Sequence, residues 1–334
     1  MSEELALDSL LSREPGNIEA LVRKGDLRSQ AGDDRMASAL YKAALRVAGA
    51  AGTLPASLRP ALARAQAGLE RATHLFQQHL EASLALDGFG PGSRPPRFQE
   101  SLEILTGARH VDLQLQRPGT YYYPGLPQRR YYERSEFSWV GELEAVTGEI
   151  RDELLALLDQ GEERFSPYLV TDPLRQRQDL HGLVDNLNWS TLYLWEKGGP
   201  AEDQASLCPR TLAAMDKLDL ARITTRAPSI LFSRLRAGAR IPPHTGMLNG
   251  RLICHLPLIV PPGCGFRVGG ETRAWREGEL IIFDDTVEHE AWNDGESDRI
   301  ILIFDIWRPE LGQDERAAIM ALFKAIDGYG TGPG

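Results

Sequence analysis

Two histidines and one arginine in the second half of the chain have types and spacings that suit metal and anion binding. His244 follows two prolines in IPPHTG, His289 lies 45 residues later in DDTVEHEAW, and Arg299 begins an apolar run ten residues further on. Neutral imidazoles from two strands can hold a divalent metal such as Fe(II) on one side, leaving positions for a bidentate 2-oxo acid and for O2. An arginine deeper in the same sheet could pair with the far carboxylate of that acid.

The third protein ligand of a common iron site is missing from this pattern. In sites with two histidines and one carboxylate, the acid follows the first histidine by two residues, but that position here is Gly246. Three alternatives are open: water replaces the carboxylate, a halide binds in its place, or a distant acid such as Asp284 or Asp285 supplies the ligand. In a fourth, purely structural alternative, HTG is a turn and the histidines are ordinary core residues.

The elements that must position these residues follow from the hydrophobic pattern. From about residue 228 the hydrophobic period is two, in short runs separated by Pro or Gly: SILFSRLRAGARI, RLICHLPLIV, GFRVGG, LIIFDD and DRIILIFDIWRP. Such a series predicts a compact antiparallel double sheet, a jelly roll with flanking helices, whose mouth can hold a small ligand. Because the histidines lie where loops meet these strands, the mouth is the predicted site.

The first part of the chain has a different pattern. Residues 1–87 are rich in Ala, Leu and Arg, and the small residues Gly25, Ala37 and Ala44 recur at the spacing of a tetratricopeptide repeat, whose paired helices need small side chains for close contact. A TPR-like helical domain is therefore predicted, either as a partner-binding module or as a helical cap. The Gly- and Pro-rich residues 88–100 predict a linker and residues 101–334 the sheet domain, so the fold class is α+β multidomain.

Composition excludes several classes of function. The formal net charge of -10 at pH 7 disfavours nucleic acid as a partner. No apolar run reaches the ~18 residues of a membrane span, and the N-terminus lacks the pattern of a signal peptide, so a cytoplasmic location is expected. The three cysteines lack zinc-ligand spacing, and nothing indicates a disulfide framework.

About 80 residues, 233–311, resemble the catalytic core of the aspartyl/asparaginyl β-hydroxylase family. The motifs that carry the resemblance are P-H-T-G, R-L-x-x-H-L, G-E-x-x-x-F-D-D-T-x-E-H-E-x-W-N and D-x-W-R-P-E-L, and looser segments extend it back to about residue 98. The resemblance implies a double-stranded β-helix and a dioxygenase that depends on Fe(II) and 2-oxoglutarate, consumes O2 and hydroxylates an unactivated C–H bond.

The resemblance also implies roles for individual residues. His244 and His289 match the iron ligands of a family that holds iron with two histidines and solvent, which favours water over halide at the third position. Arg299 matches the basic residue that grips the distal carboxylate of 2-oxoglutarate, and Ser233 matches a hydroxyl that helps it. One of the acids Asp284 and Asp285 is expected to hydrogen-bond a ligand imidazole.

Three residues of the strand RLICH share one face: Arg251, Ile253 and His255. In the family this face holds the inner carboxylate of the co-substrate and the acidic substrate. The resemblance thus implies that His255 binds the co-substrate and Arg251 a substrate carboxylate, although Arg251 could instead extend to solvent. Ile253 stands where animal members have a second arginine, which leaves their substrate preference open for this chain.

The expected substrate is a peptide or protein with an Asp or Asn residue that is hydroxylated at its β-carbon, or a related amino-acid-like molecule. Free proline and lipid acyl chains, which other family members hydroxylate, are the alternatives. The helical N-terminal region could bind a protein partner. A hypothesis from another class is a cupin-like protein that holds a metal at its two histidines without turnover.

Overall fold

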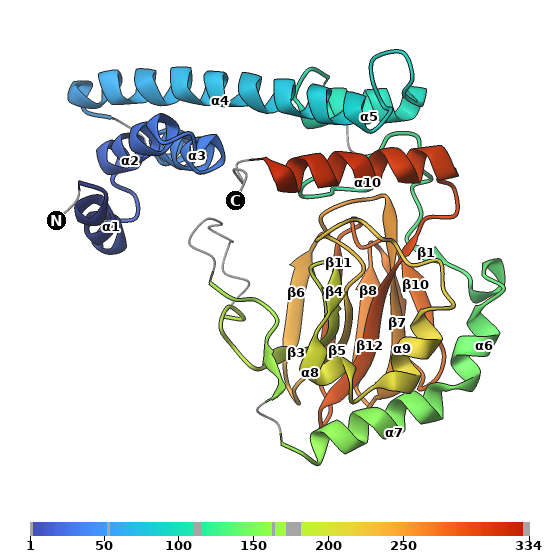
Figure 1. Cartoon of the computed structure of the whole chain (residues 1–334). Coiled ribbons are helices and arrows are strands. Elements are labelled where there is room, and N and C mark those ends of the chain that lie inside the picture. Colours follow the sequence, from blue (N-terminus) through green and yellow to red (C-terminus); the bar gives the residue numbers. More distant parts are fainter. Residues whose placement is uncertain (1–2, 52–53, 110–114, 162–163, 172–181, 330–334) are drawn as a thin grey trace. The chain divides into compact units, whose positions relative to one another are not determined.

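The computed structural model describes residues 3–51, 54–109, 115–161, 164–171 and 182–329 (Figure 1). The chain forms two compact units: a helical unit, which runs up to Ser93 and takes in the chain from Lys324 onward, and a sheet unit, Arg94–Phe323. The helix α5 (Pro96–Leu105) begins inside the range predicted as a linker. The sequence assigned all of residues 101–334 to the sheet domain, whereas the end of the chain belongs with the helical unit.

The helical unit is built around one tyrosine. Its helices are α1 (Glu3–Arg13), α2 (Ile18–Gln30), α3 (Asp34–Ala50), the short η1 (Ala56–Leu58), α4 (Arg59–Leu86) and the end of α10 (Gln313–Gly328). Tyr41 of α3 is fully buried, and its hydroxyl donates to Asp26 at 3.0 Å. A Cβ on Gly25 or Gly68 would lie only 2.6 or 2.5 Å from its ring atoms, so both glycines are needed. The helical N-terminal region is confirmed, and its TPR-like character stays a prediction.

The sheet unit contains two antiparallel sheets. The larger has the order β1 (Tyr131–Tyr132), β10 (Ile281–Phe283), β7 (Arg251–Ile259), β12 (Arg299–Trp307), β5 (Ile230–Leu235), β3 (Trp189–Glu196) and β2 (Ser166–Pro167), with β4 (Gly199–Pro200) beside β3. The smaller has the order β6 (Arg240–His244), β11 (His289–Asn293), β8 (Cys264–Val268) and β9 (Glu271–Arg273).

From β5 to β12 the chain passes back and forth between these sheets, with β8 and β9 as a hairpin inside the smaller one. This strand order is that of a jelly roll, so the predicted double sheet is confirmed. Short helices accompany it: α6 (Val140–Ala145), α7 (Thr147–Leu158), η2 (Arg134–Glu136), α8 (Glu202–Ala205) and α9 (Pro209–Met215). No helix in the described ranges has the length and apolar character needed to cross a membrane.

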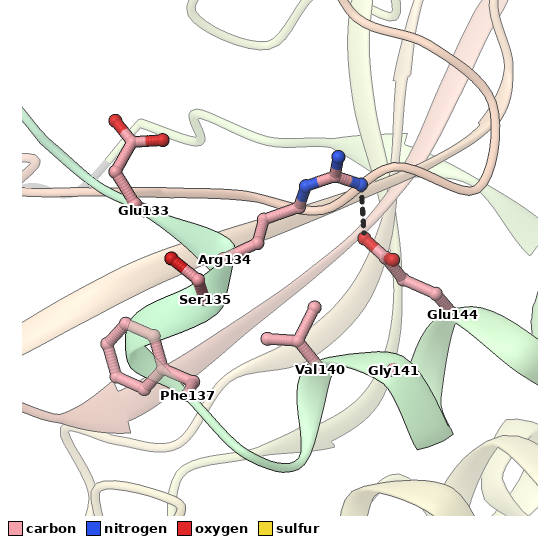
Figure 2. Close-up of a pocket in the computed structure, with 7 residues that line it drawn as sticks. All are labelled: Glu133, Arg134, Ser135, Phe137, Val140, Gly141 and Glu144. Carbon is pink, nitrogen blue, oxygen red and sulfur yellow. Dashed lines mark hydrogen bonds and ion pairs between the residues drawn. The ribbon is translucent and has the colours of Figure 1, made fainter.

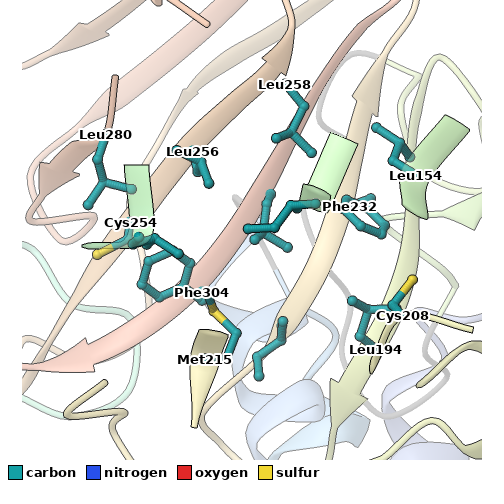
Figure 3. Close-up of a cluster of buried hydrophobic side chains, with 14 of the residues drawn as sticks. Leu154, Leu194, Cys208, Met215, Phe232, Cys254, Leu256, Leu258, Leu280 and Phe304 are labelled. Carbon is teal, nitrogen blue, oxygen red and sulfur yellow. The ribbon is translucent and has the colours of Figure 1, made fainter. Parts of the chain in front are cut away.

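The outer face of the larger sheet packs against helices. Leu256 and Leu258 of β7 and Phe232 of β5 lie in one apolar cluster with Leu154 of α7 and Met215 of α9 (Figure 3). Successive side chains of a strand point to opposite faces, so every second residue of β7 and β12 is committed to this cluster. The residues between them face the smaller sheet.

The inner face forms a second cluster between the two sheets. It includes Ile253 of β7, Phe266 of β8 and Ala291 of β11. Strand alternation brings Arg251 and His255 to the same face as Ile253, where both are buried. The fold therefore places polar side chains inside an apolar double sheet, which is where a site must be sought.

Candidate active site

His244 and His289 lie side by side on neighbouring strands of the smaller sheet. They are paired in register at the ends of β6 and β11, with their ring centroids 4.1 Å apart. The Nδ1 atom of His244 lies 2.8 Å from the carbonyl oxygen of Pro242, and that of His289 lies 3.0 Å from the carbonyl oxygen of Val287. A carbonyl oxygen only accepts hydrogen bonds, so Nδ1 carries the proton in both rings and Nε2 keeps its lone pair.

The environment keeps both imidazoles neutral. Burial lowers the pKa of His244 below its usual value, and burial together with the nearby His244 ring lowers the pKa of His289 much further. Neutral rings whose Nδ1–H is fixed by a backbone carbonyl are the form in which histidine binds a metal through Nε2. The donor set thus fits Fe(II), which accepts imidazole nitrogen.

Asp285 takes the space in which a third protein ligand would stand. A Cβ added to Gly246 would lie 1.9 Å from Oδ2 of Asp285, so no side chain fits at that position. Within the described ranges, no third His, Cys, Asp or Glu joins the two histidines in a metal-binding group. Neither Asp284 nor Asp285, the distant acids considered from the sequence, completes such a group.

Asp285 belongs instead to a buried ion cluster with Arg251. Nη2 of Arg251 lies 3.1 Å from Oδ2 of Asp285, and Nη1 lies 2.8 Å from Oδ1 of Asp305 on β12. Burial raises the pKa of Asp285 to about 6, and the neighbouring Arg251 guanidinium opposes that rise. Arg251, predicted to bind a substrate carboxylate, therefore already has two carboxylate partners in the protein.

Arg299 is a buried cation without a carboxylate partner. It is 1% exposed, its Nε and Nη1 have no hydrogen-bond partner, and its guanidinium carbon lies 4.7 Å from the ring centroid of Trp275. Burial lowers the pKa of Arg299 to about 10, so it stays charged at neutral pH. Ser233 of β5 pairs with the β12 residue two positions further along, Ile301, and is buried too. A buried arginine with free donors and a hydroxyl on the adjacent strand can seat an anion.

His255 lies among aromatic rings between the two sheets. Its ring centroid is 4.8 Å from that of Phe283, 5.0 Å from Phe266 and 6.0 Å from Trp275. Its Nδ1 is buried without a hydrogen-bond partner, and burial, followed by the charge of Arg299, lowers its pKa well below the usual value. A neutral imidazole here can donate or accept a single hydrogen bond to a ligand.

A second buried ion pair anchors the turn that leads into His289. Arg308 and Asp284 are fully buried, with Nη1 2.9 Å from Oδ2, and Arg308 also donates to the carbonyl oxygen of Pro127 at 3.0 Å. Asp284 in turn accepts from the backbone N–H of Thr286 at 3.0 Å. The sequence analysis missed Arg308 and Asp305, although a single charge within the apolar run IILIFDIW is a signal that could have identified Asp305.

A surface pocket elsewhere in the sheet unit does not include these residues. It is lined by residues of η2, the start of α6 and the segment between them, and Figure 2 shows Arg134 reaching across it to Glu144, with a 3.0 Å ion pair. Its charged groups bind each other, and none of the predicted site residues lines it. The candidate active site is therefore the interior of the double sheet.

The fold is thus a jelly roll whose interior holds two histidines and a buried arginine without a carboxylate partner. Comparison with known proteins defines the family of the chain. The family model for aspartyl/asparaginyl β-hydroxylase matches residues 144–309. A relative from Rhizobium tropici, named ornithine lipid ester-linked acyl 2-hydroxylase, is 31% identical over 234 residues, which are 69% of this chain and 76% of the relative. The chain belongs to the aspartyl/asparaginyl β-hydroxylase family.

Animal relatives share a smaller part of their length. The mouse aspartyl/asparaginyl β-hydroxylase is 37% identical over 52% of this chain, and the human protein is 34% identical over 60%. This chain spans only 22% and 26% of those two relatives. Among solved structures, a predicted oxalate decarboxylase from Thermotoga maritima matches 36% of this chain and 81% of its own, at 17% identity and a TM-score of 0.25. A similarity at so low a TM-score is no evidence for the fold, which rests on the strand order alone.

Proposed function

We propose that this chain is an Fe(II)- and 2-oxoglutarate-dependent dioxygenase that hydroxylates an unactivated C–H bond. The observation that supports it most strongly is the combination, inside one double sheet, of two neutral histidines with free Nε2 atoms and a buried arginine that lacks an anion. Its membership of a family whose relatives are named hydroxylases supports the same conclusion.

In this proposal His244 and His289 hold the metal. Bound Fe(II) would supply the activation of O2 at the expense of 2-oxoglutarate, which yields succinate and CO2. Gly246 supplies no side-chain ligand and has no room for one, so solvent would take the third position. The backbone carbonyls of Pro242 and Val287 fix the direction of both imidazoles before the metal binds.

Three residues of the chain bind and direct the co-substrate. Arg299 pairs with its distal carboxylate, for which the free Nε and Nη1 are the donors, and Ser233 contributes a hydroxyl from the adjacent strand. His255 hydrogen-bonds the inner carboxylate. The apolar rings of Phe266 and Trp275 exclude water from the space around His255, which protects a reactive site from side reactions.

The proposed substrate is an Asp or Asn residue of a peptide or protein, hydroxylated at its β-carbon, or a related amino-acid-like molecule. The helical unit is proposed to bind a protein partner. A lipid acyl chain is the second candidate, favoured by the relative whose name is ornithine lipid ester-linked acyl 2-hydroxylase and which aligns over most of its length.

The test is succinate formation by the full chain, purified without metal and loaded anaerobically with Fe(II) before air and 2-oxoglutarate are added. We expect slow succinate release without substrate, and its loss in His244→Ala and in Arg299→Met. Arg240→Met, which removes an exposed arginine paired with Asp294, is the matched control and should keep it. Absence of succinate from the fully loaded chain would instead support a non-catalytic, cupin-like metal-binding protein.

A further inference from the structure

Each of the two histidines proposed to bind the metal stands where a strand meets a loop. His244 is the last residue of β6 and is followed by the loop 245–250, whereas His289 is the first residue of β11 and is preceded by the loop 284–288. Strand pairing holds each histidine on one side only, so the loops decide the rest of its position. A segment that belongs to neither sheet, residues 116–123, binds both loops, and we name it the strap.

The start of the strap holds the loop that precedes His289. The N–H of Arg117 donates to the carbonyl oxygen of Thr286 at 2.7 Å, and Gln116 forms a β-bridge with Val287. The carbonyl oxygen of Val287 is the atom that accepts from Nδ1 of His289. The residue that orients the His289 ring is therefore held from outside its own loop.

The middle of the strap holds the loop that follows His244. The N–H groups of Gly119 and Tyr121 donate to the carbonyl oxygens of Gly246 and Met247, at 2.9 and 3.0 Å. These acceptors stand two and three residues after His244 in the chain. One short segment thus binds the backbone beside both histidines.

The side chain of Gln116 joins the two loops to each other. It is fully buried, its Oε1 accepts from Asn249 at 3.0 Å and from Gln128 at 3.0 Å, and its Nε2 donates to Asp284 and to the carbonyl oxygen of Pro127 at 3.3 Å. Asn249 lies in one loop and Asp284 in the other. A carboxamide can accept from the first and donate to the second at the same time, which neither a carboxylate nor an apolar side chain can do.

We propose that Gln116 is a positioning residue of the metal site. Through Asn249 and Asp284 it fixes the two loops relative to each other, and so the distance and direction between the Nε2 atoms of His244 and His289. A site with only two protein ligands depends strongly on this, because the displacement of either imidazole removes half of the protein donors. The inference rests on the proposed function for the role of the two histidines as ligands.

The first test is Gln116→Met, which keeps the length of the side chain and removes all four of its hydrogen bonds. Titration calorimetry of the full chain with Mn(II) at pH 7.5 should show a Kd at least about tenfold above that of the wild type, as for other groups that orient metal ligands. An unchanged Kd would overturn the proposal.

Gln128→Met is the matched control. Its side chain binds the strap at Leu115 and Gln116 and makes no hydrogen bond to either loop. The same substitution should therefore leave the Mn(II) affinity close to that of the wild type. Equal losses of affinity in the two variants would show a general loosening of the strap and would overturn the specific role of Gln116.

The visible absorption spectrum of bound Co(II) separates positioning from stability, because the bands depend on the coordination geometry of the ion. At saturating Co(II), folded Gln116→Met should give bands that differ in position or intensity from those of the wild type and of Gln128→Met. A residue that only stabilises the fold would leave the spectrum of the folded, saturated protein unchanged, so identical spectra would overturn the proposal.

A measurement on the wild type keeps the inference testable if Gln116→Met does not fold. Coupling between strap and metal is reciprocal, so saturating Mn(II) should slow hydrogen exchange of the amides in residues 117–121 by about tenfold, the factor by which opening of the strap lowers the affinity. Unchanged exchange there would overturn the proposal.

The outcomes for this inference and for the proposed function are distinguishable. Mn(II) binding by the wild type without succinate formation would refute only the dioxygenase. Succinate formation with equal Mn(II) affinities in wild type and Gln116→Met would refute only the role of Gln116. Failure of the wild type to bind Mn(II) would overturn both.

Discussion

At the scale of single residues, Arg299 links stability to binding. Its guanidinium is buried with two donors unpaired, so in the absence of an anion it opposes folding. We predict that Arg299→Met raises the free energy of unfolding of the ligand-free chain by about 1–3 kcal/mol and abolishes 2-oxoglutarate binding. Urea unfolding and calorimetry measure the two effects. A variant that is less stable than the wild type would show that Arg299 has a structural partner rather than a ligand to bind.

His255 is predicted to make the stability of the chain depend on pH. Burial and the charge of Arg299 hold its pKa in the folded state well below the ~6.5 of an unfolded chain. The unfolded state therefore binds a proton, below about pH 6.5, that the folded state does not, and stability falls as the pH falls.

The measurement compares wild type with His255→Gln, both free of metal, by urea unfolding at pH 7.5 and at pH 5.5. The wild type should lose more stability over this interval than the variant, by up to about 1.4 kcal/mol for each pH unit below ~6.5. Because other titrating groups are common to both proteins, the difference reports His255. An equal loss of stability in the wild type and in His255→Gln between pH 7.5 and pH 5.5 would contradict a lowered pKa of His255 in the folded state.

At the scale of elements, the turn between β10 and β11 carries Asp285 and leads into His289, the first residue of β11, and the Asp284–Arg308 pair holds this turn. We predict that Arg308→Met lowers the free energy of unfolding by about 3–5 kcal/mol, because it leaves Asp284 buried without its partner. Metal binding should weaken as well, since His289 loses its fixed position.

The control for Arg308→Met is Arg240→Met, which breaks an exposed pair with Asp294 and should cost less than about 1 kcal/mol. Urea unfolding and a Mn(II) titration of both variants are the measurements. Similar losses in the two variants would contradict the anchoring role of the buried pair. Arg299→Met and Arg308→Met are expected to change stability in opposite directions, although both remove a buried guanidinium.

Restoring the carboxylate of the common iron triad at position 246 is predicted to weaken this site. The Cβ of Gly246→Asp would overlap the Asp285 carboxylate, which would have to move away from Arg251. We expect a loss of about 1–3 kcal/mol of stability, as for other overpacked positions, and weaker Mn(II) binding measured by calorimetry. Gly246→Ala, which adds the Cβ alone, should lose a similar amount. Tighter metal binding by Gly246→Asp would contradict this prediction. It would show that the turn can move to admit a carboxylate and that the contact with Asp285 does not prevent a third protein ligand.

The local sequence predicted the strands and which of their residues share a face. The period-two runs located the inward strands, and alternation along RLICH placed Arg251, Ile253 and His255 on one face. The partner of Arg251 could not be predicted in the same way, because Asp305 reaches it through the register between β7 and β12, which pairs Asp305 with Ile253. Register is set by the pairing of whole strands and not by the local sequence of either.

At the scale of the whole molecule, the net charge does not predict the charge inside the sheet unit. The chain has a net charge of -10, yet the interior of its sheet unit holds a buried unpaired cation. The composition change near residue 88 predicted two domains, but no local signal indicated that the chain from Lys324 onward belongs with the helical unit. The assignment of these last residues to the helical unit depends on packing between segments that are distant in sequence.

The two units should respond separately to substitutions in their cores. A Cβ at Gly25 would lie 2.6 Å from Cε1 of Tyr41, so Gly25→Ala is predicted to destabilise the helical unit by about 1–3 kcal/mol. All six tryptophans of the chain lie within residues 139–307, so their fluorescence reports the sheet unit alone, whereas far-ultraviolet circular dichroism reports the helices of both units.

For Gly25→Ala, thermal unfolding followed by circular dichroism should show a transition moved to lower temperature, while the tryptophan transition and the affinity for 2-oxoglutarate stay at their wild-type values. Arg308→Met should do the reverse, moving the tryptophan transition. If Gly25→Ala moves both transitions together, the two units fold as one cooperative body, and the helical unit then supports the active site and is more than a module for binding a partner.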